Sequence, residues 1–234
     1  MDINGKKAIV FGGTSGIGLS ATQMLSDKGA HVIALSRNPE KVRNVPKNVT
    51  TKKMNVLDRD ALEQFFQEVG EYDILVNSAT GGARAVGPFL SMDLDGYRAS
   101  FDKLWGYTNV VRYGTKHLKD NGNIVLVSGS PARKCRPGQI AISSVGGAVE
   151  AFARGIAPEI APKRINIVSP GIIDTPMSPL KGKEREDYYN NTTKNNLIPR
   201  AGTPDEVATG IIFAIENEFI TGTTIDIDGG WLIS

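Results

Sequence analysis

The feature that most limits how this chain can fold is a glycine-rich turn between an apolar run and an amphipathic segment. The apolar run is Lys7–Phe11, the turn is Gly12-Gly13-Thr14-Ser15-Gly16-Ile17-Gly18, and residues 17–28 have the apolar spacing of a helix. Glycines at these points permit a tight turn and close packing of the helix on the strand. The free amide groups at the helix start then favour an anion. The sequence therefore predicts a strand, a phosphate-binding turn and a helix.

The rest of the chain repeats the alternation of short apolar runs and longer amphipathic segments. Near-continuous apolar strands that alternate with helices are typical of a parallel sheet covered on both faces. We expect an α/β fold, one Rossmann domain over residues 1–234, with a doubly wound parallel sheet of about seven strands. The predicted strands are 7–11, 31–36, 49–55, 74–77, 123–128, 164–169 and 223–227, and the predicted helices are 17–28, 59–69, 94–119, 143–160 and 203–217.

Three local signals refine this outline. Thr203 followed by Glu206 is a capping box, which predicts a helix start. Pro158 lies inside a predicted helix and should kink or end it. Residues 178–199 are polar and without a strong period, and they follow the sixth strand, so we expect a mobile lid at the ligand edge of the sheet.

Composition narrows the class of protein. A net charge of +2 gives no reason to expect nucleic acid or a membrane surface as a partner, and no apolar stretch approaches the roughly 18 residues of a membrane span. The one cysteine, Cys135, cannot form an internal disulfide, and no signal peptide precedes the first strand. We expect a cytoplasmic protein without a metal site.

The end of the second predicted strand points to one of the two nicotinamide cofactors. An NAD site typically has an acidic residue there, which would repel a 2′-phosphate. Here the residues are Ser36-Arg37-Asn38, and Ser36 and Arg37 can bind and neutralise that phosphate. The pattern favours NADP(H) over NAD(H), although a surface arginine on a turn is the plain alternative.

The Gly-x-x-x-Gly-x-Gly spacing resembles that of the short-chain dehydrogenase/reductase family, and the resemblance covers essentially the whole chain. It extends to Asn77-Ser78-Ala79-Thr80, Asn55-Val56, the stretch from Ser169-Pro170-Gly171 to Thr175-Pro176, and the C-terminal Thr203–Ala208 and 221–230 segments. By this resemblance, Asn55 meets the adenine and Thr175 meets the nicotinamide carboxamide or a phosphate. The resemblance and the turn together imply these cofactor-binding residues: Gly12, Thr14, Ser15, Gly16, Ile17, Gly18, Ser36, Arg37, Asn55, Val56, Asn77, Ala79, Pro170, Gly171, Ile173 and Thr175.

The resemblance breaks at the catalytic residues. The family uses an Asn, a Ser, a Tyr and a Lys, and the corresponding positions here hold Lys103, Gly129, Ile142 and Gly146. Ile142 cannot carry a proton and Gly146 has no charge. Loss of a positioned general acid costs about 10²–10⁴-fold in rate. The family's usual mechanism therefore cannot operate unchanged.

Lys103 and Ser130 are the candidate replacements. If Gly146 leaves room, the Lys103 ammonium can approach the position of the missing lysine, and burial would lower its pKa and make it a proton donor. The plain alternative is a lysine that extends to the surface or into an interface between helices. Serines also occur at strand ends and helix caps for structural reasons, and Trp105 is most simply a core or interface residue.

Three functions fit these residues. The first is an NADP(H)-dependent oxidoreductase that acts on an unknown small carbonyl or alcohol through an atypical site. The second is a non-catalytic NADP(H)-binding sensor, and the third an isomerase or dehydratase. We favour the first, because a sensor of the phosphate end alone would not need the nicotinamide-side stretch around Thr175. The resemblance also implies a homodimer or homotetramer formed through the predicted helices 94–119 and 143–160.

Overall fold

The computed structural model describes residues 1–42, 45–80 and 83–234. Its centre is a seven-stranded sheet in the order β3-β2-β1-β4-β5-β6-β7 with parallel pairing throughout. The order reverses direction at β1, which is the point where such sheets bind ligands. The strands are β1 (Lys7–Phe11), β2 (His31–Ser36), β3 (Val49–Lys53), β4 (Tyr72–Asn77), β5 (Leu118–Val127), β6 (Arg164–Pro170) and β7 (Thr224–Ile227).

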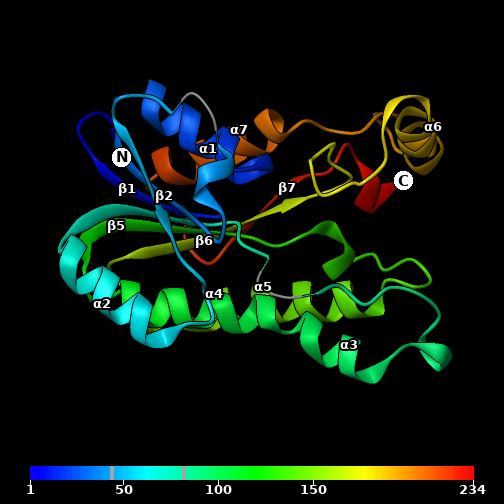
Figure 1. Ribbon diagram of the computed structural model, residues 1–234, viewed down its shortest axis with the longest axis horizontal. Coiled ribbons are helices and arrows are strands. Elements are labelled where there is room, and N and C mark those ends of the chain that lie inside the picture. The colour runs from blue at the N-terminus through cyan, green and yellow to red at the C-terminus, as the bar shows by residue number, and fades with distance from the viewer. Residues whose placement is uncertain (43–44, 81–82) are drawn as a thin grey trace.

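Helices cover both faces of this sheet, as the alternating pattern predicts. Figure 1 shows α1 and α7 on one face and α2, α4 and α5 on the other. The α-helices are α1 (Gly16–Asp27), α2 (Arg59–Val69), α3 (Leu94–Ser100), α4 (Asp102–Gly114), α5 (Ile140–Ile160), α6 (Gly182–Thr193) and α7 (Pro204–Glu216). Short 3₁₀ turns are η1 (Pro39–Lys41), η2 (Phe89–Ser91), η3 (Ser130–Ala132) and η4 (Trp231–Ile233).

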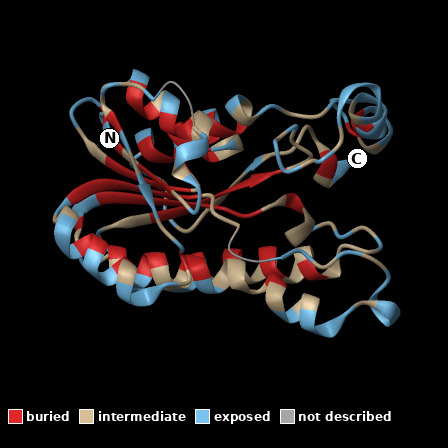
Figure 2. Ribbon diagram, viewed as in Figure 1, coloured by how far each residue is buried: buried red, intermediate tan, exposed pale blue. Residues whose placement is uncertain are grey.

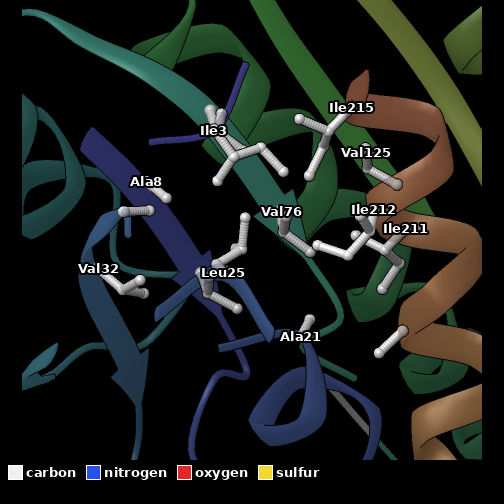
Figure 3. Close-up of a cluster of buried hydrophobic side chains, with 14 of the residues drawn as sticks. Ile3, Ala8, Ala21, Leu25, Val32, Val76, Val125, Ile211, Ile212 and Ile215 are labelled. Atoms are coloured by element: carbon white, nitrogen blue, oxygen red, sulfur yellow. The ribbon is translucent and has the colours of Figure 1, made fainter. Parts of the chain in front are cut away.

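Two hydrophobic cores lie on the two faces of the sheet. In one, Leu25 of α1 and Ile211 of α7 pack against Val76 and Val125 of the central strands (Figure 3). In the other, Phe66 of α2 and Tyr107 of α4 pack beneath the same strands. The central strands are accordingly buried along their length (Figure 2). A sheet buried on both faces holds its strand ends rigidly, and the candidate site is built on those ends.

The predicted helix 94–119 is wrong in its extent. The structure divides it into α3 and α4 at Phe101, and the chain after Gly114 turns into β5, which begins at Leu118. Asp93 starts α3, because its carboxylate accepts hydrogen bonds from the amides of Asp95 and Gly96. The predicted strand 123–128 is therefore too short at its beginning, where the β4–β5 register shifts.

Helix α5 begins earlier than predicted and runs past Pro158. It ends at Ile160, because Ala161 precedes Pro162 and a residue before proline avoids the helical conformation. The 21-residue α5 is long and apolar enough to meet a length-and-composition test for a membrane span, with mean hydropathy 1.3 in its best window. The expectation that no stretch approaches that length is thus corrected. Val149 and Ala153 pack into the core of the sheet, which accounts for much of this apolar character.

The other local predictions fare differently. The Thr203 capping box is present, since Thr203 Oγ1 accepts from the Glu206 amide and the Glu206 carboxylate accepts from the Thr203 amide. Residues 178–199, whose sequence has no strong period, contain α6. This helix is almost wholly polar and buries only Tyr189 and Thr193, so its sequence carries no apolar stripe that could have revealed it.

Candidate cofactor and active site

A cavity of about 380 Å³ opens at the carboxyl ends of the strands, beside the point where the sheet order reverses. It contains most of the cofactor-binding residues expected from the sequence. Those that line it are Gly12, Thr14, Ser15, Gly16, Ile17, Gly18, Ser36, Arg37, Asn55, Val56, Ala79, Pro170 and Thr175. Three others, Asn77, Gly171 and Ile173, lie outside the lining.

The glycine turn forms the floor of this cavity. Ser15 is the residue before α1 and is extended, and its side chain does not cap the helix, so the first amides of α1 stay free for a ligand. A side chain at Gly18 would place its Cβ 2.1 Å from the carbonyl oxygen of Gly12. Only glycine fits there, and the close approach leaves the turn open to a phosphate.

The ends of β2 and β3 form one end of the cavity. Ser36 Oγ is buried and has no hydrogen-bond partner within the described residues, while Arg37 is exposed beside it. Lys41 of η1 also lines this end, although the sequence did not single it out. Asn55 Oδ1 accepts from the Leu57 amide, which fixes that side chain at the cavity wall. The group meets the needs of a doubly charged phosphate on a ribose: an unused hydroxyl and two cations.

The loop after β4 is held by its own side chains. Asn77 is fully buried, and its Oδ1 accepts from the amide of Ala79 at 3.1 Å. Ser78 Oγ donates to the Phe11 carbonyl at 3.1 Å, which ties this loop to the end of β1. Asn77 thus supports the cavity from behind, and Ala79 lines it.

In the stretch after β6, some residues position the chain and others line the cavity. Gly171 packs against Asp228, where a Cβ would lie 2.8 Å from the Asp228 Cα, and Ile173 pairs with Gly202. These two contacts direct the chain so that Thr175 returns to the cavity. The Thr175 side chain lies next to Gly16, 3.6 Å from where a Cβ there would be. The Cβ and methyl group of Thr175 face this turn, and its hydroxyl accepts a hydrogen bond from the Met177 amide at 3.4 Å.

Lys103 reaches the cavity from α4. Its Nζ donates to the carbonyl oxygen of Ser128 at 3.2 Å and lies 5.4 Å from the centre of the Tyr107 ring. Burial, followed by repulsion from Arg84, lowers the pKa of Lys103 to about 7. An amine with this pKa holds and releases a proton near neutral pH, as a general acid or base must.

The structure separates the two serines that flank Gly129. Ser128 directly follows β5 and lines the cavity, and its Oγ donates to the Gly146 carbonyl at 3.2 Å. Ser130, the candidate from the sequence, begins η3, is fully buried and lies outside the lining. Ser128 is therefore the serine that accompanies Lys103 at the cavity.

The space above Gly146 is filled rather than open. A Cβ at Gly146 would lie 3.0 Å from the Ala132 Cβ and 3.4 Å from Ser128 Oγ. The structure places the Lys103 amine at the Ser128 carbonyl, and its approach to the space next to Gly146 stays a prediction. Beside Ile142, Ser144 accepts a hydrogen bond from the Tyr97 hydroxyl at 3.0 Å. Trp105 is 60% exposed, which excludes a place in the core of the described chain.

Sequence reasoning missed Arg84, Lys41 and Met177, all of which line the cavity. Arg84 lies in the loop between β4 and α3, Lys41 in a 3₁₀ turn and Met177 before α6. No motif marks these positions, because loop residues reach the cavity only through the tertiary path of the chain.

Comparisons with known proteins identify a family and relatives that this chain resembles. The family model described as Enoyl-(Acyl carrier protein) reductase matches residues 12–232. The chain is similar to the 3-oxoacyl-[acyl-carrier-protein] reductase FabG of Thermotoga maritima, 33% identical with all of both chains covered. It is 28% identical to carbonyl reductase family member 4 of Danio rerio, over 95% of this chain and 96% of that protein.

Solved structures extend the likeness to the fold. A small-chain dehydrogenase in complex with NADPH superposes with a TM-score of 0.83 at 26% identity, covering 99% of this chain and all of the other. ElxO with NADP bound gives a TM-score of 0.88 at 26% identity, covering 98% of this chain and all of the other. From the matched family model, the full-length relatives and the shared fold, the chain belongs to the short-chain dehydrogenase/reductase family.

Proposed function

We propose that the protein is an NADP(H)-dependent oxidoreductase of the short-chain type, in which Lys103 carries the proton for a small carbonyl or alcohol substrate. One observation carries the proposal. The Lys103 ammonium lies in the same cavity as the glycine turn, at the end of β5, where the family places its catalytic serine.

The residues at the cavity fit NADP(H). The unpartnered Ser36 hydroxyl with Arg37 and Lys41 suits the 2′-phosphate, and the glycine turn with the start of α1 suits the pyrophosphate. Structural neighbours described as NADPH-bound or NADP-bound support the same cofactor. When bound, this cofactor supplies the hydride that is exchanged with the substrate carbon.

Lys103 then supplies the proton. In its protonated form it can donate to the oxygen of a carbonyl that is being reduced, and in its neutral form it can accept the proton of an alcohol that is being oxidised. With a pKa of about 7, reduction should fall above that pH and oxidation should rise. The Ser128 hydroxyl already donates to Gly146, so it helps to hold the end of β5.

Two further parts of the proposal concern the surroundings of the site. Helix α6 is the proposed lid, joined to the cavity wall because Arg185 donates to the Thr175 carbonyl and the Asp174 carboxylate. We also infer a homodimer or homotetramer, since Trp105 of α4 is 60% exposed and only a third of the apolar window of α5 is buried. The cytoplasmic location and the lack of nucleic-acid and membrane partners stay predictions.

The test is NADPH consumption with a panel of aldehydes, ketones and quinones. Wild type is compared with Lys103→Met and with Lys116→Met, which removes an exposed lysine that does not line the cavity. We expect the first variant to lose about 10²–10⁴-fold in kcat and the second to keep its activity. If Lys103→Met keeps its turnover, Lys103 is not the proton carrier, but the protein is still an oxidoreductase.

The sensor and isomerase hypotheses gain no support from the relatives that the chain resembles. Each remains a distinct outcome of the same assay. Tight NADPH binding without turnover on any carbonyl would favour the sensor, and substrate conversion without net NADPH consumption would favour the isomerase.

A further inference from the structure

The charged residues at the cavity are of one sign. The described residues that line it include Arg37, Lys41, Arg84 and Lys103, and no Asp or Glu. Cations lining a partly enclosed space, with no acid there to offset them, raise the local concentration of anions and favour anionic ligands. The charges that line the cavity therefore favour the binding of more than one negatively charged group.

The four cations fall into two pairs by their place in the fold. Arg37 and Lys41 follow β2 and lie at the proposed 2′-phosphate end. Arg84 follows β4, and Lys103 reaches the cavity from α4 next to the end of β5. Because the pyrophosphate is matched by the free amides of the glycine turn and α1, the phosphates of NADP(H) have their partners without Arg84 and Lys103.

Arg84 and Lys103 repel each other. Arg84 contributes to lowering the pKa of Lys103, so the two cations act on one another through the cavity. The contacts of Lys103 are a neutral carbonyl and the ring of Tyr107. Arg84 makes no hydrogen bond or ion pair with another residue in 1–42, 45–80 or 83–234. An anion bound at Arg84 would offset this repulsion.

We propose that the substrate carries an oxyanionic group, a carboxylate or a phosphate, and that the Arg84 guanidinium binds it while Lys103 faces the reacting oxygen. This inference rests on the proposed function and names its substrate class. The guanidinium can bind either anion through two parallel hydrogen bonds, which would fix the orientation of the substrate as well as its charge. Arg84 is thus the specificity-determining residue.

The first experiment measures anion binding without catalysis. Benzoate and inorganic phosphate are titrated separately, by calorimetry, into protein saturated with NADP⁺, so that the 2′-phosphate end is filled. We expect at least one of them to bind wild type, Arg84→Met to weaken it by about 10–100-fold, and Arg84→Lys to retain part of the affinity. Lys116→Met, which removes a remote charge, should bind as wild type does. Which probe binds separates carboxylate from phosphate.

The same titration has a second readout at Lys103. A bound anion favours the charged amine, so the pKa of Lys103 should rise in wild type and not in Arg84→Met. Binding of neither anion, or equal binding in wild type and Arg84→Met, would overturn the inference. Weaker NADPH binding in Arg84→Met would assign Arg84 to the cofactor instead and would also overturn it.

Matched substrates separate this inference from the proposed function. 4-Carboxybenzaldehyde and methyl 4-formylbenzoate differ in one negative charge, and we expect kcat/KM to favour the acid by about 10-fold or more in wild type and not in Arg84→Met. Equal turnover of both aldehydes contradicts the inference and leaves the oxidoreductase intact. Arg84-dependent anion binding without any turnover supports the anion site and contradicts the oxidoreductase.

Discussion

The ammonium nitrogen of Lys103 lies 3.2 Å from the carbonyl oxygen of Ser128, so a side chain of α4 reaches the last residue before the Gly129 turn. An ammonium has three donors, and this contact uses one of them. The others have no hydrogen-bond partner among the described residues, and both Lys103 and Ser128 line the cavity. By the resemblance to the short-chain family, Lys103 stands at the position of the catalytic asparagine, and the proposed function has its amine exchange a proton there.

The buried amine should leave a signature in stability. The pKa of Lys103 is lowered from 10.5 to about 7 in the folded protein. Between these values the unfolded chain binds more protons than the folded one, so stability should rise with pH from about 7 towards 10, by up to about 1.4 kcal/mol per unit. Chemical denaturation at pH 7, 8 and 9 should show this slope in wild type and a smaller one in Lys103→Met. Equal slopes would show that Lys103 titrates like an exposed lysine.

Cofactor choice should depend on the end of β2. Arg37→Ser removes a cation at the proposed 2′-phosphate site, and loss of a charge-assisted contact should weaken NADPH binding by about 10–100-fold. NADH binding should barely change, because NADH has no 2′-phosphate. Fluorescence titration of both nucleotides measures the ratio, with Lys116→Ser as the control for net charge. An equal loss of affinity for NADPH and NADH would show that Arg37 does not contact the 2′-phosphate.

The glycine turn should not tolerate a methyl group. Gly18→Ala would bring Cβ within 2.1 Å of the Gly12 carbonyl oxygen, so the turn must distort. We expect NADPH affinity to fall by at least about 10-fold, with a loss of about 1–3 kcal/mol in stability. Gly155→Ala is the matched control, since nothing lies within 4 Å of its Cβ and alanine favours a helix. Nucleotide titration and thermal melting distinguish the two.

An ion pair between α5 and the segment after η3 supports the fold. Glu150 of α5 is 3% exposed, and its carboxylate lies 3.3 Å from Nε of Arg133, which also binds Asp226 of β7. Arg133→Met leaves the buried carboxylate without its main partner, and Arg133 is itself part-exposed, so we expect a loss of about 1–3 kcal/mol.

The pH dependence of that loss follows from its cause. Burial already raises the pKa of Glu150, and removing Arg133 should raise it further. The unfolded carboxylate is charged above about pH 5, so the destabilisation should be larger at pH 8 than at pH 5. Glu150→Gln added to Arg133→Met should recover most of the loss. No recovery would assign the effect to the contact between Arg133 and Asp226.

Local signals explain which parts of the molecule could be predicted. The strands around Val76 and Val125 are continuous apolar runs, and the Gly12–Gly18 turn carries its own conformational demand, so both can be recognised from sequence alone. Helix α6 has no apolar stripe, and no proline or glycine stands at the break between α3 and α4 at Phe101. Neither feature has a local sequence signal.

In the candidate site, too, some residues could be predicted from the sequence and others could not. Ser36 and Pro170 are the last residues of β2 and β6, and parallel strands bring their ends to one edge of the sheet. Whether Ser128 or Ser130 faces the cavity depends on the path of η3, and the place of Arg84 depends on a long loop. Neither the η3 turn nor this loop has a periodic pattern in its sequence that predicts its path. Lys103 could be identified because a family position fixed its place, whereas its contact with the Ser128 carbonyl required the packed structure.

The most direct measurement is the titration of Lys103 in the NADP⁺-loaded protein, by NMR of isotopically labelled lysine side chains, with the resonance assigned by its loss in Lys103→Met. We predict a midpoint near pH 7, well below the usual value of 10.5 for a lysine side chain. A Lys103 that stays protonated to about pH 10 could not exchange a proton at neutral pH, and that result would contradict its role as the proton carrier.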